Sequence, residues 1–179
     1  MAAMVKKAVA KAKVPTSGPA MRVAVAKDVL KLIQLKLKVD NGIYLERPTV
    51  SKYCTPKGLQ ALIPKIASEC TVCAKGAIAL AHVHLFDHET SLSFDANRKA
   101  CDIWGTDNAN MIEAAFERWS TFVPYPMSSA DIAACYRFGN RFFNPVNRLK
   151  AIMKNVIANN GKFVPTDLRN RGHKTKGEK

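Results

Sequence analysis

The fold is decided by residues 70–86, which read CTVCAKGAIALAHVHLF. This is the longest stretch of the chain that is apolar on nearly every side, and Lys75 is its only charged residue if the histidines are neutral. A helix without a wide polar face is buried in a protein core. Its small residues let neighbouring helices approach closely, while larger ones such as Leu80 fill the space between them. Seventeen residues at about 1.5 Å each fall short of a bilayer, so we expect the central helix of a globular domain.

The chain of 179 residues, with 47% hydrophobic and 23% charged residues, has the length and composition of one soluble domain with tails. We interpret the fold as α+β and mostly helical, with a single domain over residues 20–165 built around the buried central helix. Residues 1–19 and 166–179 are predicted to be basic disordered tails, because they contain no sustained apolar pattern.

One small antiparallel hairpin is predicted near residues 35–46. Leu35, Leu37 and Val39 alternate with lysines, and residues 43–45 resume an apolar run after the sequence Asp-Asn-Gly. Alternation on both sides of such a turn is typical of a hairpin, because Asn and Gly tolerate positive φ. In the alternative interpretation, the first helix begins near Ala20 and continues to Val39 instead of ending near Gln34.

Capping residues predict where the other helices begin. They are Thr55 before a short helix over residues 56–63, Asp95 before a helix ending at Trp104, Thr106 before the next helix, Ser128 before a helix through about Phe143, and Asn144 before the last helix. Asn-Asn-Gly at residues 159–161 predicts the end of that last helix.

The net charge of +14 is concentrated at the two ends of the chain. Residues 1–27 hold six Lys or Arg and no acid, and residues 162–179 hold six against two acids. Basic ends on a nearly balanced core favour a polyanionic partner, most often nucleic acid, because phosphate contacts release condensed counterions. The alternative is that the basic ends only keep the protein soluble.

Residues 136–143 interleave aromatic and cationic side chains, as YRFGNRFF. Such a composition is typical of surfaces on which bases stack while guanidinium groups hold phosphates. The alternative places Phe138 and Phe142 in the core and leaves the arginines on an ordinary solvated face. The residues predicted to bind nucleic acid are Lys6, Lys7, Lys11, Lys13, Arg137, Arg141, Arg148, Arg169, Arg171, Lys174 and Lys176.

Five cysteines make an odd count scattered through apolar patterns, which favours free thiols in a reducing compartment. The first residues contain lysines but no apolar core of about 7 to 15 residues, so they do not resemble a secretory signal. We therefore expect a cytoplasmic protein that does not bind a membrane.

Two further chemistries have to be weighed around the central helix. Cys70 and Cys73 with His84 and His88 contain zinc-ligand residue types, but on a continuous helix His84 lies about 16 Å along the axis from Cys73. They share a metal only if the helix breaks, for instance at Gly76. Alternatively, Cys73 is a nucleophile with His84 and an acid such as Asp87 or Asp95. Cysteine is more often simply buried, so we assign no catalytic residue, metal or cofactor.

Residues 148–165, RLKAIMKNVIANNGKFVP, and residues 70–76, CTVCAKG, resemble segments of small uncharacterised proteins encoded by tailed bacteriophages and their bacterial hosts. This resemblance covers about 25 residues and implies a phage or bacterial setting without a catalytic motif. Where that family has Gly-Gly, this chain has Asn160-Gly161, which still allows a left-handed helix end.

The sequence thus predicts a small, basic, non-enzymatic accessory protein that associates with nucleic acid largely without sequence specificity. Two alternatives remain: a protein-contact module, such as a host-directed inhibitor or virion component, and an enzyme or metal-binding protein that uses Cys and His.

Overall fold

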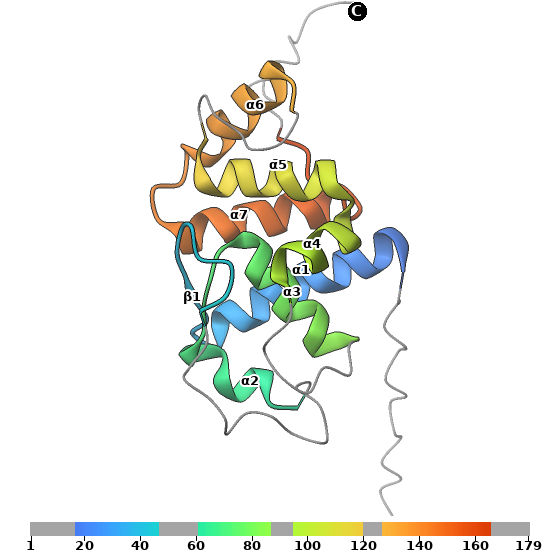
Figure 1. Ribbon diagram of the computed structural model, residues 1–179, viewed down its shortest axis with the longest axis vertical. Helices are drawn as coiled ribbons and strands as arrows, with labels where there is room; N and C mark the ends of the chain where they lie inside the picture. Colours follow the sequence, from blue (N-terminus) through green and yellow to red (C-terminus); the bar gives the residue numbers. More distant parts are fainter. Residues whose placement is uncertain (1–16, 47–60, 87–94, 120–126, 166–179) are drawn as a thin grey trace, which may run out of the picture.

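Seven α-helices and two very short strands make up the part of the chain that the computed structural model describes, residues 17–46, 61–86, 95–119 and 127–165 (Figure 1). In chain order they are α1 (Gly18–Gln34), β1 (Lys38–Val39), α2 (Ile63–Ile66), the 3-10 helix η1 (Ala67–Glu69), β2 (Thr71–Val72), α3 (Ala74–Leu85), α4 (Ala96–Trp104), α5 (Thr106–Glu117), α6 (Ser129–Gly139) and α7 (Pro145–Ala158).

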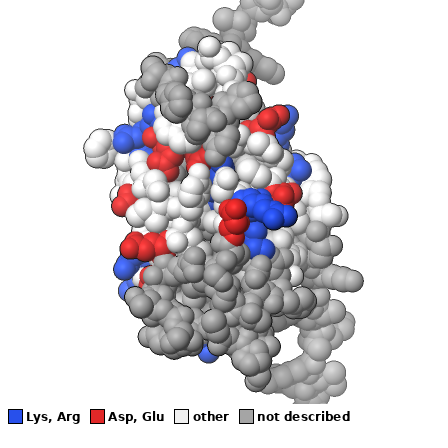
Figure 2. All heavy atoms as spheres, in the orientation of Figure 1, with Lys and Arg blue, Asp and Glu red and all other residues white. Residues whose placement is uncertain are grey.

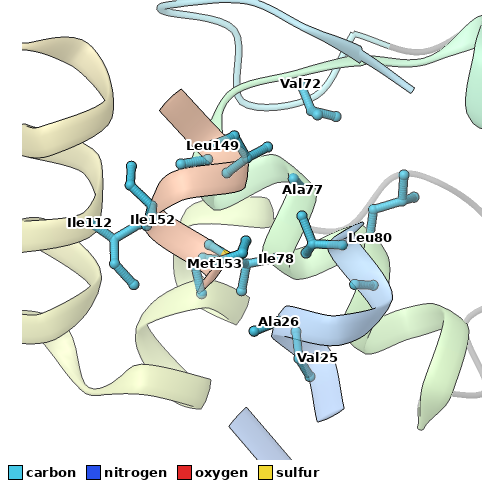
Figure 3. Close-up of a cluster of buried hydrophobic side chains, with 14 of the residues drawn as sticks. Val25, Ala26, Val72, Ala77, Ile78, Leu80, Ile112, Leu149, Ile152 and Met153 are labelled. Atoms are coloured by element: carbon cyan, nitrogen blue, oxygen red, sulfur yellow. The ribbon is translucent and has the colours of Figure 1, made fainter. Parts of the chain in front are cut away.

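The predicted central helix is confirmed as α3, in which nine of twelve residues are buried. It packs against α1, α4 and α5, and α7 packs in turn against α1 and α5. Figure 3 shows the resulting core, where Val25 of α1, Ile78 of α3, Ile112 of α5 and Ile152 of α7 meet. The prediction placed the start of this helix too early, because Cys70 to Val72 are extended and α3 begins only at Ala74.

The predicted antiparallel hairpin is wrong, although its turn residues are in the right place. β1 pairs with β2 in parallel, and Glu46, on the other arm of the turn, forms an isolated antiparallel bridge to Thr71. The backbone of Thr71 exchanges two hydrogen bonds with Glu46, while Lys38 donates to the Cys70 carbonyl. The two arms therefore bond to a segment inserted between them instead of to each other.

The loop over residues 40–46 lies directly on the first turn of α3, and Gly76 makes this approach possible. A Cβ atom at residue 76 would lie 1.4 Å from the carbonyl oxygen of Tyr44. The backbone of Cys73 also donates to the Ile43 carbonyl, so the loop is fixed to the start of the helix. Glycine is thus required here by the close approach of another backbone segment.

The first helix ends at Gln34, which contradicts its extension to Val39. Lys36 has a φ of 67°, and its neighbour Leu37 donates to the carbonyl of Leu32. A left-handed residue followed by such a bond is a common way to end a helix. At the other end α1 begins at Gly18, so residues 18–19 belong to this helix and not to the predicted tail.

Three of the predicted caps are confirmed. The side chains of Asp95, Ser128 and Asn144 each accept a hydrogen bond from the backbone N–H three residues later. Thr106 is not a cap, because Gly105 occupies that position and Thr106 is the first helical residue. Thr55 and most of the predicted helix over residues 56–63 lie outside the described residues, as do residues 1–16 and 166–179 of the predicted tails.

Candidate functional site

The most unusual side chain near the aromatic segment is Arg148, which is 0% exposed. Its guanidinium donates to the carbonyls of Phe142 at 3.0 Å and Phe143 at 2.9 Å, to Asn41 Oδ1 at 3.2 Å, and to the carbonyl of Phe116. Arg148 therefore ties the end of α5, the α6–α7 connection and the residue 40–42 turn to α7. Burial lowers the pKa of Arg148, and the positive charge of nearby Arg118 lowers it further.

The burial of Arg148 does not fit the prediction that it contacts phosphate. The sequence could not reveal this burial. Two of the four acceptors, on α5 and in the residue 40–42 turn, are distant from α7 along the chain, and the other two precede the start of α7. An arginine in this position organises the backbone, and its charge is satisfied inside the protein.

Arg148 holds in place a small surface that we name the Arg–Phe corner, made of half-buried Arg118 and exposed Phe143. Phe143 is 89% exposed, and the guanidinium carbon of Arg118 lies 5.8 Å from the centre of its ring. Arg118 ends α5 in the left-handed conformation, with a φ of 59°. Sequence reasoning missed Arg118, because it lies eighteen residues before the start of the aromatic segment at residue 136.

Arg137 and Arg141 do not share a helix, although the predicted helix through about Phe143 would include both. α6 ends at Gly139, four residues earlier than expected, so Arg141 lies in the α6–α7 connection. Arg137 is exposed, whereas Arg141 is half-buried and its guanidinium carbon lies 6.0 Å from the centre of the Phe138 ring. Gly139 lets the end of α6 approach α5, since a Cβ there would lie 2.0 Å from the Ala115 carbonyl oxygen.

Charge is distributed unevenly over the described helices. Residues 95–119, which include α4 and α5, hold three Lys or Arg and five acids, whereas residues 127–165, which include α6 and α7, hold six and one. The face drawn in Figure 2 nevertheless shows blue and red side chains interspersed. The remaining residues predicted to bind nucleic acid are Lys6, Lys7, Lys11, Lys13, Arg169, Arg171, Lys174 and Lys176, which lie outside the described part of the chain.

A second candidate site is a small pocket of about 160 Å³ beside the start of α3. It is lined by Gly42, Tyr44, Cys73, Glu113, Glu117 and Trp119. Burial raises the pKa of the Cys73 thiol to about 12, and it outweighs the backbone N–H groups of Gly76 and Lys75, which lower it. Cys73 therefore stays protonated at neutral pH and lacks the thiolate that a nucleophile needs.

The structure does not bring Cys73 and His84 together. α3 is continuous through Gly76, which places the two residues at opposite ends of the helix, about 16 Å apart along its axis. His84 Nδ1 lies 2.7 Å from Oδ2 of buried Asp28, on α1, and Asp95 caps α4. The thiol arrangement is thus not assembled among the described residues, and Asp87 lies outside them.

The Cys70, Cys73, His84 and His88 set is likewise not assembled. His88 lies outside the described residues, and within the described ranges no three His, Cys, Asp or Glu side chains are placed to hold a metal ion. Burial raises the pKa of Cys70 to about 11.

Behind the pocket, Lys75 is completely buried and forms a polar cluster with Glu113, Asn97 and Asn110. Its Nζ lies 2.6 Å from Glu113 Oε2, 2.8 Å from Asn97 Oδ1 and 3.0 Å from Asn110 Oδ1. Sequence reasoning noted Lys75 as the one charge in an apolar stretch but did not identify its partners on α4 and α5. The cluster joins α3, α4 and α5 and satisfies its own charges, so we regard it as structural.

Comparison of the chain with protein-family models, curated proteins and solved structures found no match. In the described part of the chain, no helix combines the length and the apolar character needed to span a bilayer.

Proposed function

We propose that this protein is a small, basic, non-enzymatic accessory protein of a phage or bacterium that associates with nucleic acid largely without sequence specificity. The observation that carries the proposal is the Arg–Phe corner: an exposed aromatic ring beside a guanidinium group, with the ring on residues 127–165, which hold six Lys or Arg and one acid. Cations and aromatic rings on one surface are the groups that nucleic-acid-binding proteins use for phosphates and bases.

The affinity comes mainly from the two basic ends of the chain, and the corner orients the protein on its partner. Residues 1–16 carry four lysines and no acid, and residues 166–179 carry five cations against two acids. Each cation that meets a phosphate releases a condensed counterion, which gives binding that tolerates any sequence and weakens steeply with salt. Four of the five cysteines are described, and all four are free, which supports a place in the cytoplasm.

The proposal is tested with the full-length protein and fluorescently labelled DNA and RNA oligonucleotides, by anisotropy from about 50 to about 200 mM salt. Two variants remove four charges each, one by Lys→Gln at residues 6, 7, 11 and 13 and the other by Arg or Lys→Gln at residues 169, 171, 174 and 176. We expect each to bind about tenfold more weakly at low salt and to show a shallower salt dependence.

The matched control changes Lys27, Lys31, Lys36 and Lys38 to Gln, which removes the same charge from exposed positions near α1 and β1. We expect this variant to bind nearly as well as the unmodified protein. Equal weakening in all three variants would show that net charge alone attracts nucleic acid, and a full-length protein that does not bind at low salt would contradict the proposal. The basic ends would then act in solubility, and a protein-contact function would replace nucleic-acid binding.

A further inference from the structure

We infer that Phe143 is a stacking platform for an unpaired base, so that the protein prefers single-stranded to double-stranded nucleic acid. This inference rests on the proposed function and names its substrate class. The first observation is the exposed fraction of the Phe143 side chain. Among the described residues, the exposed large hydrophobic side chains are Leu35 at 45%, Tyr44 at 41% and Phe143 at 89%. Phe143 is thus nearly as accessible as a side chain can be.

Exposure alone is ordinary for a single apolar residue, but the backbone that carries this ring is fixed from the inside. Arg148 donates to the carbonyls of both Phe142 and Phe143, and the next residue, Asn144, caps α7 by accepting from the N–H of Asn147. Phe142 itself packs on the core, with its ring centre 5.9 Å from that of Phe138. The connection therefore turns one aromatic ring inward and presents its neighbour outward on a rigid backbone.

The surroundings of the ring point to a nucleobase rather than to an apolar partner. The guanidinium carbon of Arg118 lies over the Phe143 ring, 5.8 Å from its centre, so a base that stacks on the exposed ring has a cation nearby for its phosphate. Arg137 is exposed and Arg141 half-buried on the same short segment. An apolar protein surface would offer Arg118 no negative charge, whereas a nucleotide supplies both a flat ring and a phosphate.

Stacking of this kind requires a base that is not already paired. In a duplex the bases are stacked on one another, and a protein that contacts only phosphates gains nothing from an exposed ring. A single strand offers the π-face of every base, which also explains why such binding need not depend on sequence. Phe143 is then the side chain that distinguishes single-stranded from double-stranded nucleic acid, whereas the charges around it contribute to the binding of both.

The experiment measures binding of the full-length protein to a labelled single strand and to the duplex of the same sequence. Phe143→Ala is expected to weaken single-strand binding about tenfold and to leave duplex binding within about twofold, with an unchanged salt dependence because no charge is lost. Phe143→Trp is expected to bind the single strand at least as tightly as the unmodified protein, and its added fluorescence to be quenched by the oligonucleotide. Phe143→Leu keeps apolar area but loses the π-face, so it is expected to behave like the alanine variant.

Leu35→Ala is the matched control, since it truncates another exposed apolar residue away from the corner, and it is expected to leave both affinities unchanged. Full binding by Phe143→Leu would overturn stacking in favour of a simple apolar contact. Equal losses on single strand and duplex, or no loss in Phe143→Ala, would overturn the inference while the proposed function stands. Absence of binding to either substrate by the unmodified protein would overturn both and leave a protein partner for the corner.

Discussion

Removing one member of the buried Lys75–Glu113 pair is expected to destabilise the protein more than removing both. Lys75 is 0% exposed and Glu113 is 4% exposed, so neither charge has water to replace its partner. In Lys75→Met the carboxylate of Glu113 stays buried without its cation, 2.6 Å from where the ammonium was. Breaking a buried pair in this way costs about 3 to 5 kcal/mol, a large share of the roughly 5 to 15 kcal/mol that stabilises a typical domain.

The double variant Lys75→Met/Glu113→Met removes both charges and keeps similar side-chain volumes. What remains unsatisfied is mainly the Oδ1 atom of Asn110, which is 2% exposed, whereas half-buried Asn97 has access to solvent. One buried acceptor without a donor costs about 1 to 3 kcal/mol. The double variant is therefore expected to be more stable than Lys75→Met alone.

The assay is urea unfolding followed by circular dichroism, with the free energy of unfolding taken from the midpoint at constant slope. The control is the exposed pair Arg98–Asp102, whose nitrogen and oxygen lie 4.0 Å apart and whose side chains are 81% and 71% exposed. Arg98→Gln is expected to change stability by no more than about 0.5 kcal/mol. If the losses of Lys75→Met and Glu113→Met simply add up in the double variant, the two residues are not a coupled pair and this reasoning is refuted.

Three further predictions concern the loop, the thiols and the pocket. Gly76→Ala is expected to lower the free energy of unfolding by about 3 kcal/mol or more, because the new Cβ would overlap the Tyr44 carbonyl. Gly→Ala within a helix usually stabilises a protein, so a higher urea midpoint for this variant would contradict the close approach. In iodoacetamide labelling followed by peptide mass spectrometry, half-buried Cys101 should react before the three buried thiols. Burial raises the pKa of those thiols to about 11, 12 and 12 in Cys70, Cys73 and Cys135. Early labelling of Cys73 would contradict this expectation and support a nucleophilic thiol. Burial raises the pKa of Glu117, so folding favours the protonated form of this side chain. The contribution of Glu117 to stability therefore falls as pH rises from about 4.3 through the folded-state pKa. In urea melts, Glu117→Gln should be more stable than the unmodified protein at pH 7 and should lose that advantage below about pH 4.

Local sequence signals predicted the helices well where the cap and the apolar stripe are adjacent in the chain. α7 begins directly after its Asn144 cap, with Pro145 in its first turn, and ends at the predicted Asn-Asn-Gly. The apolar run at residues 70–86 was harder to divide, because a continuous apolar stretch does not distinguish a buried strand from a buried helix. β2 was for that reason taken as the first turn of α3.

The candidate site was less predictable, because its decisive contacts are not local. A cationic residue after an aromatic segment indicates a surface, yet Arg148 is buried by acceptors on the end of α5, on the α6–α7 connection and in the residue 40–42 turn. Arg118 joins the corner only because α5 and α6 lie side by side. The alternation around residues 35–46 indicated the extended backbone that is found at Lys38–Val39, but it carried no information about the partner strand.

We expect the insertion of β2 between the two arms of the residue 40–46 loop to make this region form late during folding. A hairpin closes locally, whereas Lys38 must find Thr71 about thirty residues further along the chain, at a higher cost in loop-closure entropy. The pairing is therefore expected after α1 and α3 have docked, and it is not part of an early nucleus. Because Asp40, Glu46 and Thr71 all bond across this one junction, their amide protons are expected to exchange with solvent together when it opens, on both sides of β2 at once.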